Sequence, residues 1–284
     1  MVNIKLFVCC HHPVEVPEQP LLIPIQVGAA LSNERFPHFL QDDSGDHISR
    51  KNRSYCELTA QYWAWKNVQA DYYGFFHYRR YLYPDQKARR PYRIAQKPVP
   101  ALLEKLGYGE FADLIQKYDL ILPIGENMYV PVRKHYANAP FHREQDLALI
   151  ERIVRERYPE MTTALNQYLS GTVSYFGNIY IMKQCVFQDY CAWLFPLLEE
   201  FDLRADRSGY SPQEQRVDGY LAERLLGIYQ TYHRELRKTE LPRVHFDAID
   251  SNVDYTKRLL YFFLPPGTRR RMAVKKILMS KKDS

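Results

Sequence analysis

The stretch DYYGFFHYRRY, residues 71–81, contains a short aromatic run that is followed at once by basic side chains. The uncharged run Tyr72–Phe76 predicts a buried β-strand. His77, Arg79 and Arg80 then lie at its carboxyl end, where ligands bind in open α/β sheets. Because arginine can bind two phosphate oxygens at once, the pattern favours an anionic ligand such as the diphosphate of an activated sugar. Ordinary surface is the alternative interpretation.

Strands and helices alternate along the rest of the chain. Further strands are predicted at Ile4–Cys10, 118–123 and 178–182, and an extended segment begins at Leu21 and ends in a turn at 27–30. Helices are predicted from Ser54 to about Asn67, over 101–117, 142–158, 160–170 and 184–201, and from about Arg216 to Tyr229. This alternation predicts an α/β fold with a mostly parallel sheet flanked by helices.

Two local patterns add to this outline. Ser54 and Glu57 have the spacing of a capping box, with Ser54 as the N-cap and Glu57 at the third helical position. The proline- and arginine-rich segment 83–100 has no pattern of its own and is predicted to be a mobile flap. We expect one domain over residues 1–260, followed by a separate tail over 261–284.

Composition points to a globular protein of the cytosol. Of the 284 residues, 46% are hydrophobic and 25% are charged, which is ordinary for a soluble domain. The five cysteines are odd in number and lack paired metal-ligand spacing, no signal-peptide pattern opens the chain, and no run approaches the ~20 apolar residues of a membrane span. The 23 tyrosines suit contacts with sugars or bases, although they also fill half-buried positions.

The positive charge is concentrated at the end of the chain. Residues 269–284 contain seven lysines and arginines against one aspartate, which accounts for the whole formal net charge of +6. A balanced body argues against a nucleic-acid-binding surface spread over the fold. Apolar residues interleave with the tail's cations, as in a short interfacial helix on anionic lipid. A disordered, solvated tail is the alternative.

Several common catalytic signatures are absent from the sequence. It has no G-x-S-x-G elbow and no glycine-rich phosphate loop. His11 and His12 are candidate metal ligands, but neighbouring residues of an extended chain point in opposite directions, so only one can face a site. The loop with Asp43 and Asp46 is either a divalent-ion site or an acidic turn, and it lacks the glutamate of a calcium loop. Glu57 caps its helix or faces a cleft, where it would bind a ribose or sugar hydroxyl.

Six segments together resemble a family of bacterial capsular and exopolysaccharide biosynthesis proteins. That family was long described as a domain of unknown function and is now associated with galactofuranosyltransferase activity. The resemblance covers about residues 1–235 and is carried by IKLFV with His11, PIQVGAA at 24–30, DSGDHIS at 43–49, YCELTAQYWAWKN at 55–67, HYRRY at 77–81 and the Glu223-Arg224-Leu225 helix. It does not reach the basic tail.

The resemblance implies a glycosyltransferase of the GT-A type, which is a Rossmann-like nucleotide-sugar domain. Metal-dependent members of that fold place Asp-X-Asp at the end of a central strand, where it holds a divalent ion. On that template His77-Tyr78-Arg79 replaces the two carboxylates. We therefore expect no metal or other cofactor, with Arg79 and Arg80, assisted by His77, binding the departing diphosphate. Mn²⁺ or Mg²⁺ remains the alternative.

Inverting transfer needs a general base near the acceptor hydroxyl. Glu223 and Asp218 lie on the helix that usually supplies it in this fold, and the resemblance supports Glu223. Asp43 or Asp46 is the reserve candidate, and an exposed structural glutamate is the alternative for Glu223. His11, Asp46 and Glu57 are the further candidates for donor binding.

These observations together predict a glycosyltransferase of surface-polysaccharide assembly (capsule, O-antigen or exopolysaccharide). The resemblance favours a UDP-sugar donor, UDP-galactofuranose first, and a glycan or lipid-linked acceptor. We expect a cytoplasmic protein that attaches to the inner membrane surface through its basic tail. Two rivals remain: a non-catalytic module that binds nucleotide-sugars or glycans, and a nucleic-acid binder built on the tail, which the balanced body disfavours.

Overall fold

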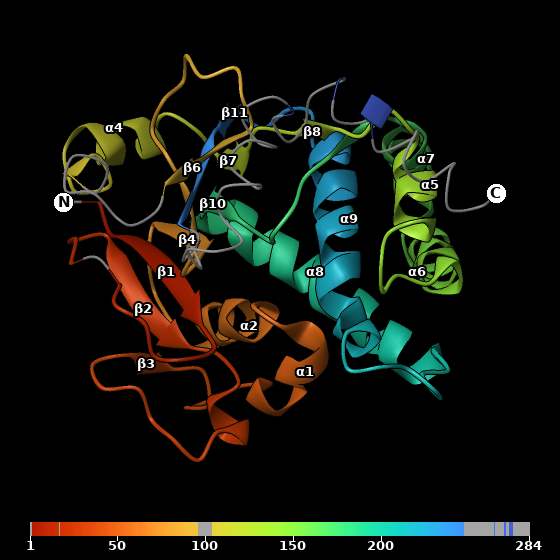
Figure 1. Cartoon of the computed structure of the whole chain (residues 1–284), viewed down its shortest axis with the longest axis horizontal. Helices are drawn as coiled ribbons and strands as arrows, with labels where there is room; N and C mark the ends of the chain where they lie inside the picture. The colour runs from red at the N-terminus through yellow and green to blue at the C-terminus, as the bar shows by residue number, and fades with distance from the viewer. Residues whose placement is uncertain are drawn as a thin grey trace.

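The central sheet of the protein has helices on both faces (Figure 1). The computed structural model describes residues 2–16, 18–95 and 104–246, together with four separate residues of the C-terminal segment, Leu264, Arg270, Ala273 and Val274. The predicted basic tail therefore lies almost wholly outside the described residues, and so do residues 96–100 of the predicted flap.

The sheet is mostly parallel, as predicted. Its main path has the order β11-β7-β10-β4-β1-β2-β3. The strands are β1 (Ile4–Cys10), β2 (Leu22–Gln26), β3 (Leu40–Gln41), β4 (Tyr72–His77), β7 (Leu120–Pro123), β10 (Tyr180–Lys183) and β11 (Lys238–Leu241). The pairs β1–β2, β1–β4, β2–β3 and β7–β11 are parallel, whereas β10 runs antiparallel to both β4 and β7.

A branch of the sheet begins where β4 ends. Strand β5 (Arg80–Leu82) folds back on β4, so that His77 is paired with Arg80. Strand β12 (Arg243–Phe246) then pairs with both β5 and β6 (Tyr92–Ala95). The first part of the predicted flap thus contains a strand. A separate two-stranded ribbon joins β8 (Glu126–Asn127) to β9 (Val173–Ser174).

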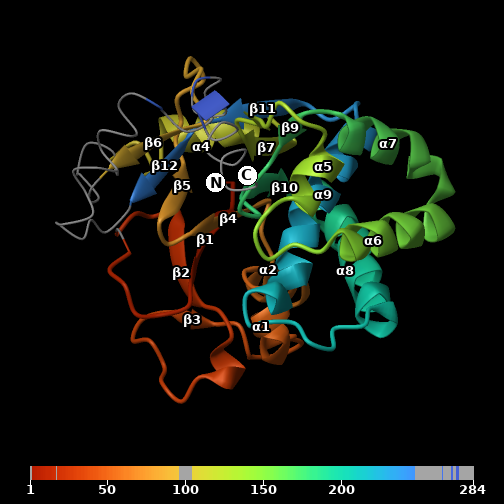
Figure 2. The ribbon, with the colours of Figure 1, turned by 45° about the vertical axis from the view of Figure 1, so that its right-hand side comes forward.

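Most of the helices gather beside the sheet on one side of the molecule (Figure 2). They are α1 (Asn52–Tyr55), α2 (Leu58–Asn67), α4 (Glu110–Gln116), α5 (Val132–Ala137), α6 (Glu144–Arg157), α7 (Thr162–Ser170), α8 (Gln184–Arg204) and α9 (Val217–Tyr232). Alternate residues of β1 and β4 face two apolar clusters: Phe7 and Phe75 pack with α2 and α8, while Leu6 and Phe76 pack with α4. Burial on both faces explains why these strands are nearly continuous apolar runs, in which Lys5 of β1 is the charged exception.

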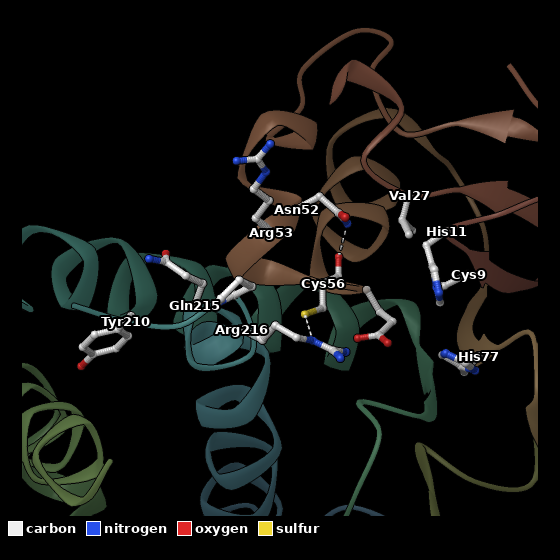
Figure 3. Close-up of a pocket in the computed structure, with 12 residues that line it drawn as sticks. Cys9, His11, Val27, Asn52, Arg53, Cys56, His77, Tyr210, Gln215 and Arg216 are labelled. Atoms are coloured by element: carbon white, nitrogen blue, oxygen red, sulfur yellow. Dashed lines mark hydrogen bonds between the residues drawn. The ribbon is translucent and has the colours of Figure 1, made fainter. Parts of the chain in front are cut away.

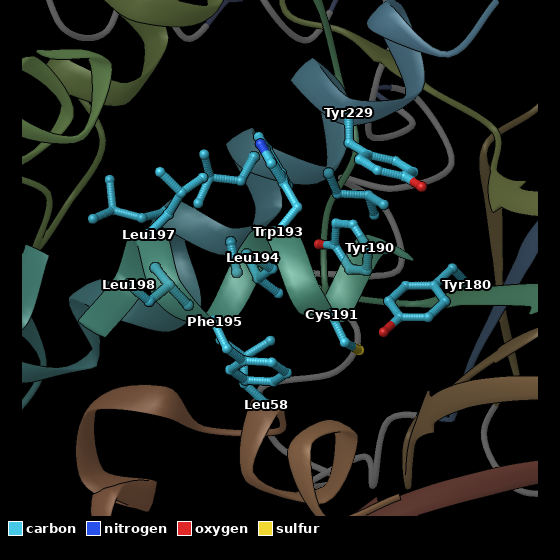
Figure 4. Close-up of a cluster of buried hydrophobic side chains, with 14 of the residues drawn as sticks. Leu58, Tyr180, Tyr190, Cys191, Trp193, Leu194, Phe195, Leu197, Leu198 and Tyr229 are labelled. Atoms are coloured by element: carbon cyan, nitrogen blue, oxygen red, sulfur yellow. The ribbon is translucent and has the colours of Figure 1, made fainter. Parts of the chain in front are cut away.

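The contact between α8 and α9 is aromatic (Figure 4). The Tyr190 and Tyr229 rings meet edge to face with centroids 5.0 Å apart, and Trp193 packs beside them. A Cβ atom at Gly227 would lie 1.9 Å from the Tyr168 ring, so only glycine lets α9 approach α7 this closely. These contacts fix the direction of α9, and the segment that leads into α9 forms one wall of the site described below.

The structure corrects several predicted elements. The capping box is wrong, because a helix already begins at Asn52, breaks at Cys56 and resumes at Leu58. The Ser54 hydroxyl contacts Asp218 and Arg207 instead of capping α2. Helix α4 begins at Glu110 rather than at 101. Helix α5 and strands β11 and β12 were not predicted. No helix within the described ranges combines the length and apolar character needed to span a bilayer.

Candidate functional site

A cavity of about 740 Å³ opens at the carboxyl ends of β1, β2 and β4 (Figure 3). The strand ends provide Cys9, His11, Val27 and His77, the α1–α2 junction provides Asn52, Arg53, Cys56 and Glu57, and the segment leading into α9 provides Tyr210, Pro212, Gln215 and Arg216. This is the place where ligands bind in open parallel sheets. Three of the predicted site residues, His11, Glu57 and His77, therefore line one cavity.

The basic cluster after β4 forms a tight hairpin beside the cavity. His77 is the last residue of β4 and lines the cavity, Tyr78 and Arg79 make the turn, and Arg80 begins β5. Arg79 is exposed and lies over the Tyr78 ring, at 5.1 Å from its centroid. Neither Arg79 nor Arg80 is in an ion pair within the described residues. Both lie next to the cavity rather than in its lining.

His77 is a neutral hydrogen-bond donor rather than a cation. Its Nδ1 accepts the backbone N–H of Arg79 at 3.2 Å, so the proton of the neutral ring is on Nε2. Burial, with smaller contributions from Arg80 and Arg79, lowers the pKa of His77 to about 2. The sequence analysis treated His77 as an assistant to the cationic pair, and the structure assigns it an uncharged role.

His11 shares this uncharged character. Its ring lies 6.1 Å from the His77 ring, centroid to centroid, and packs edge to face against His12. Burial, then the charges of His12 and Arg216, lowers the pKa of His11 to about 4. Two neutral imidazoles therefore line the strand ends at neutral pH, where they suit hydroxyl or phosphate oxygens.

Arg216 supplies the positive charge of the opposite wall. Its Nε donates to the Cys56 Sγ at 3.3 Å, and Figure 3 shows the guanidinium and His77 approaching the same space from opposite sides. In the described part of the chain neither Arg216 nor Arg53 has a carboxylate in salt-bridge range. The sequence analysis missed both arginines as site residues, together with Asn52 and Cys56.

Cys56 connects the two walls. Its backbone has φ 51° and ψ −127°, a conformation that favours glycine, and it separates α1 from α2. The Asn52 amide donates to the Cys56 carbonyl at 2.8 Å and holds the junction. A Cβ atom on Gly219 would lie 3.2 Å from the Cys56 Sγ, so the absence of a side chain there lets α9 press against this junction. Burial raises the pKa of the Cys56 thiol to about 12, so it is not a nucleophile at neutral pH.

Glu57 is the acidic residue among those that line the cavity. It precedes the first residue of α2, yet its side chain makes no capping hydrogen bond. Burial raises the pKa of Glu57, and Glu223 adds to this, while Arg216 and Arg80 act in the opposite direction. Of the two roles considered for Glu57 in the sequence analysis, helix cap or cleft residue, the structure therefore supports the cleft residue.

The structure places Glu223 outside the cavity lining and surrounds its carboxylate with partners. One oxygen accepts the backbone N–H of Gly177 at 2.6 Å, and the other forms an ion pair with the buried guanidinium of Arg224. Gly177 in turn borders Arg80, whose Nη1 would lie 3.8 Å from a Cβ at that position. Glu223 therefore supports the loop against which Arg80 lies.

The other predicted carboxylates are also engaged. Asp218 is fully buried behind the cavity wall, where it contacts Ser54 and the Arg207 guanidinium at 2.9 Å. Burial, then the charge of Asp202, raises the pKa of Asp218 to about 7. Asp43 forms a 2.6 Å ion pair with Arg35, and Asp46 accepts the Tyr62 hydroxyl at 3.2 Å. None of the three lines the cavity.

The residues at the end of β4 do not fit a divalent cation. A hard cation of this kind prefers carboxylate and carbonyl oxygens, whereas this strand end presents a neutral imidazole, a phenol and two guanidinium groups. No three histidine, cysteine or acidic side chains cluster in metal-binding geometry within the described residues. The chemistry of these side chains suits an anion.

Two comparisons with known proteins found a match. A family model described as "Domain of unknown function (DUF4422)" matches residues 5–234. Among solved structures, the apo structure of the bifunctional glycosyltransferase WbbM is similar over 86% of this chain, with 30% identity and a TM-score of 0.81. This chain covers 45% of the WbbM chain. No curated protein matches it.

Proposed function

We propose that this chain, which belongs to the DUF4422 family, is a glycosyltransferase that uses a nucleotide-activated sugar. One observation carries the proposal: arginines without carboxylate partners in the described residues surround a cavity at the parallel strand ends. The similarity to WbbM, a bifunctional glycosyltransferase, supports the reaction class. Because fixed positive charge stabilises a departing diphosphate, the site suits cleavage of a sugar–diphosphate bond.

The leaving group would be bound from both walls of the cavity. Arg216 reaches it from the start of α9, and Arg79 and Arg80 lie at the β4–β5 hairpin, beside His77. Neutral His77 donates one hydrogen bond and the guanidinium groups supply the charge. This set of donors supports transfer without a divalent ion, with the cations in the place that Asp-X-Asp occupies in metal-dependent enzymes of the GT-A type.

The finer assignment rests on the resemblance described in the sequence analysis. It favours a UDP-sugar donor, UDP-galactofuranose first, inverting transfer, and a glycan or lipid-linked acceptor of capsule, O-antigen or exopolysaccharide synthesis. A cytoplasmic enzyme that contacts the inner membrane surface through residues 269–284 fits this role, because seven cations there would attract anionic lipid.

Release of nucleoside diphosphate tests the proposal. The full chain is incubated with UDP-, GDP- and dTDP-sugars, with EDTA or with Mn²⁺, and both thermal shift and product release are recorded. We expect one donor class to stabilise the fold, by about 2.7 kcal/mol at 100 times its dissociation constant, and to be slowly hydrolysed in EDTA. Activity that disappears with EDTA and returns with Mn²⁺ would refute the metal-independent mechanism.

A non-catalytic module is the second candidate, because the strand end lacks the Asp-X-Asp carboxylates. It predicts that a nucleotide-sugar stabilises the protein while no diphosphate is released with any acceptor or metal. The two candidates therefore differ in a single measurable product.

A further inference from the structure

Transfer of a sugar to a hydroxyl requires a group that accepts the hydroxyl proton, and one carboxylate in the described structure is placed for this. Glu57 lines the cavity, and its side chain accepts no hydrogen bond from another residue and forms no ion pair within the described ranges. A general base needs a free lone pair that faces the substrate. Glu57 meets this requirement by its position in the cavity lining, because the hydrogen bond at its carboxylate comes from its own backbone N–H and not from another residue.

The other acidic candidates fail on the same two criteria. Both oxygens of Glu223 are occupied, by the Gly177 N–H and by Arg224. Asp218 is buried against Arg207, and Asp43 is paired with Arg35. Each would have to give up an existing interaction before it could accept a proton, and none of the three lines the cavity.

The α1–α2 junction holds Glu57 in place. The preceding residue, Cys56, has the unusual backbone angles that end α1, and its Sγ accepts the Arg216 Nε–H at 3.3 Å. Gly219 lets α9 approach this junction closely. Glu57, which directly precedes α2, is therefore held in a fixed position between Arg216 and the strand ends. A base in a fixed position loses little entropy during the reaction.

Given the proposed glycosyltransferase activity, we propose that Glu57 is the catalytic base. Its carboxylate takes the proton of the acceptor hydroxyl while that oxygen bonds to the anomeric carbon of the donor. The bond from the anomeric carbon to the diphosphate oxygen breaks, and its electron pair leaves with the nucleoside diphosphate, whose charge Arg216 and Arg80 neutralise. With water in place of the acceptor, the same step gives donor hydrolysis.

The electrostatic surroundings agree with this role. Burial raises the pKa of Glu57, and the nearby Glu223 contributes in the same direction, while Arg216 and Arg80 act against it. A carboxylate with a raised pKa is a stronger base once it is ionised. Activity should therefore rise with pH through the raised pKa of Glu57.

The experiment compares Glu57→Gln with the wild type and with Glu199→Gln, the same carboxylate-to-amide change at an exposed residue of α8 outside the cavity. We expect Glu57→Gln to lower kcat for diphosphate release by about 10²-fold or more while its thermal shift with the donor stays within about 1 °C of wild type. The acidic limb of the pH–rate profile should disappear in Glu57→Gln, and Glu57→Asp should recover part of the rate. Glu199→Gln should keep wild-type kcat.

Two outcomes are distinguishable. If the wild type releases diphosphate and Glu57→Gln does so within threefold of it, the base assignment is overturned while the glycosyltransferase stands. If the wild type binds donors but releases no diphosphate under any condition, the proposed function fails and takes the base with it. Should Glu223→Gln rather than Glu57→Gln abolish the acidic limb, Glu223 is the base.

Discussion

The arginines of this protein differ sharply between the cavity and the helical side. On the helical side, Arg133 pairs with Glu151 at 2.7 Å, Arg157 with Glu200 at 2.7 Å, and Arg207, which follows α8, contacts both Asp202 and Asp218. Around the cavity, no salt bridge within the described residues involves Arg53, Arg79, Arg80 or Arg216. The arginines on the helical side are thus paired with carboxylates, whereas those at the strand ends are not.

This difference has an energetic meaning. Exposed pairs such as Arg157–Glu200 contribute at most about 1 kcal/mol each, so they are tolerant of change. Cations that lie close together without carboxylate partners repel one another, and this disfavours folding slightly. The pKa of Arg80 is lowered by burial and then by the charge of Arg243. A fold keeps such an arrangement where an anionic ligand compensates for it. Substitutions in the two regions should therefore affect different quantities.

The largest effect on folding is expected at Asp218. Asp218→Ala removes a buried partner of Arg207 and should lower the free energy of unfolding by about 3 kcal/mol. Because burial raises the pKa of Asp218 to about 7, the neutral form is already accessible, and Asp218→Asn should cost much less. Urea denaturation at pH 7 measures both variants. Equal losses for Ala and Asn would show that the charge, rather than the packing and hydrogen bonds, governs this site.

The next effect separates the two groups of arginines directly. Arg80→Ala should lower kcat for diphosphate release about 10²-fold, as expected when one charge that stabilises the leaving group is lost. Arg204→Ala, which removes the ion pairs with Glu156 and Glu200, should leave kcat unchanged and barely change the stability, because surface ion pairs contribute little. An unchanged rate in Arg80→Ala would remove this arginine from the leaving-group site.

Sequence patterns predict the elements of this fold where the pattern is local. Strands β1 and β4 are mostly apolar runs, interrupted in β1 by Lys5, because both of their faces are buried, and they were predicted within a residue of their ends. The sequence KTEL of β11 has only one buried residue, so no periodicity marks it as a strand. The antiparallel direction of β10 depends on partners far along the chain, which no local pattern records.

The site divides in the same way. His77 and His11 follow the ends of predicted strands and Glu57 lies in the first turn of a predicted helix, so the rule about strand ends brings them together. The contact between Cys56 and Arg216 joins residues that are 160 positions apart, and the sequence around neither residue predicts it. Glu223 could not be separated from Glu57 by sequence, because the difference lies in which carboxylate already has partners.

A smaller effect tests the neutral histidines of the cavity. The pKa of His77 is lowered to about 2, against 6.5 in the unfolded chain, so between these values the unfolded state binds the additional proton. Stability must therefore fall as pH falls, by about 2 kcal/mol between pH 6.5 and pH 5 from this residue alone. His77→Asn should remove that share of the slope. NMR titration of the His77 ring offers an independent check, and a midpoint above pH 6 would contradict the neutral assignment.

The smallest effect concerns the strained junction beside Glu57. With φ at 51° and ψ at −127°, Cys56 pays a backbone cost that glycine avoids, so Cys56→Gly should gain up to about 1 kcal/mol in unfolding free energy. Cys56→Ala keeps the strain and loses the sulfur contact with Arg216, so it should be less stable than the wild type. We expect the free energy of unfolding to be highest for the glycine variant, lower for the wild type and lowest for the alanine variant. If diphosphate release is also slowed in both variants, the strained backbone of Cys56 is needed for the function of the cavity. If both variants were less stable than the wild type by the same amount, the thiol contact with Arg216, and not the backbone, would hold Glu57 in position.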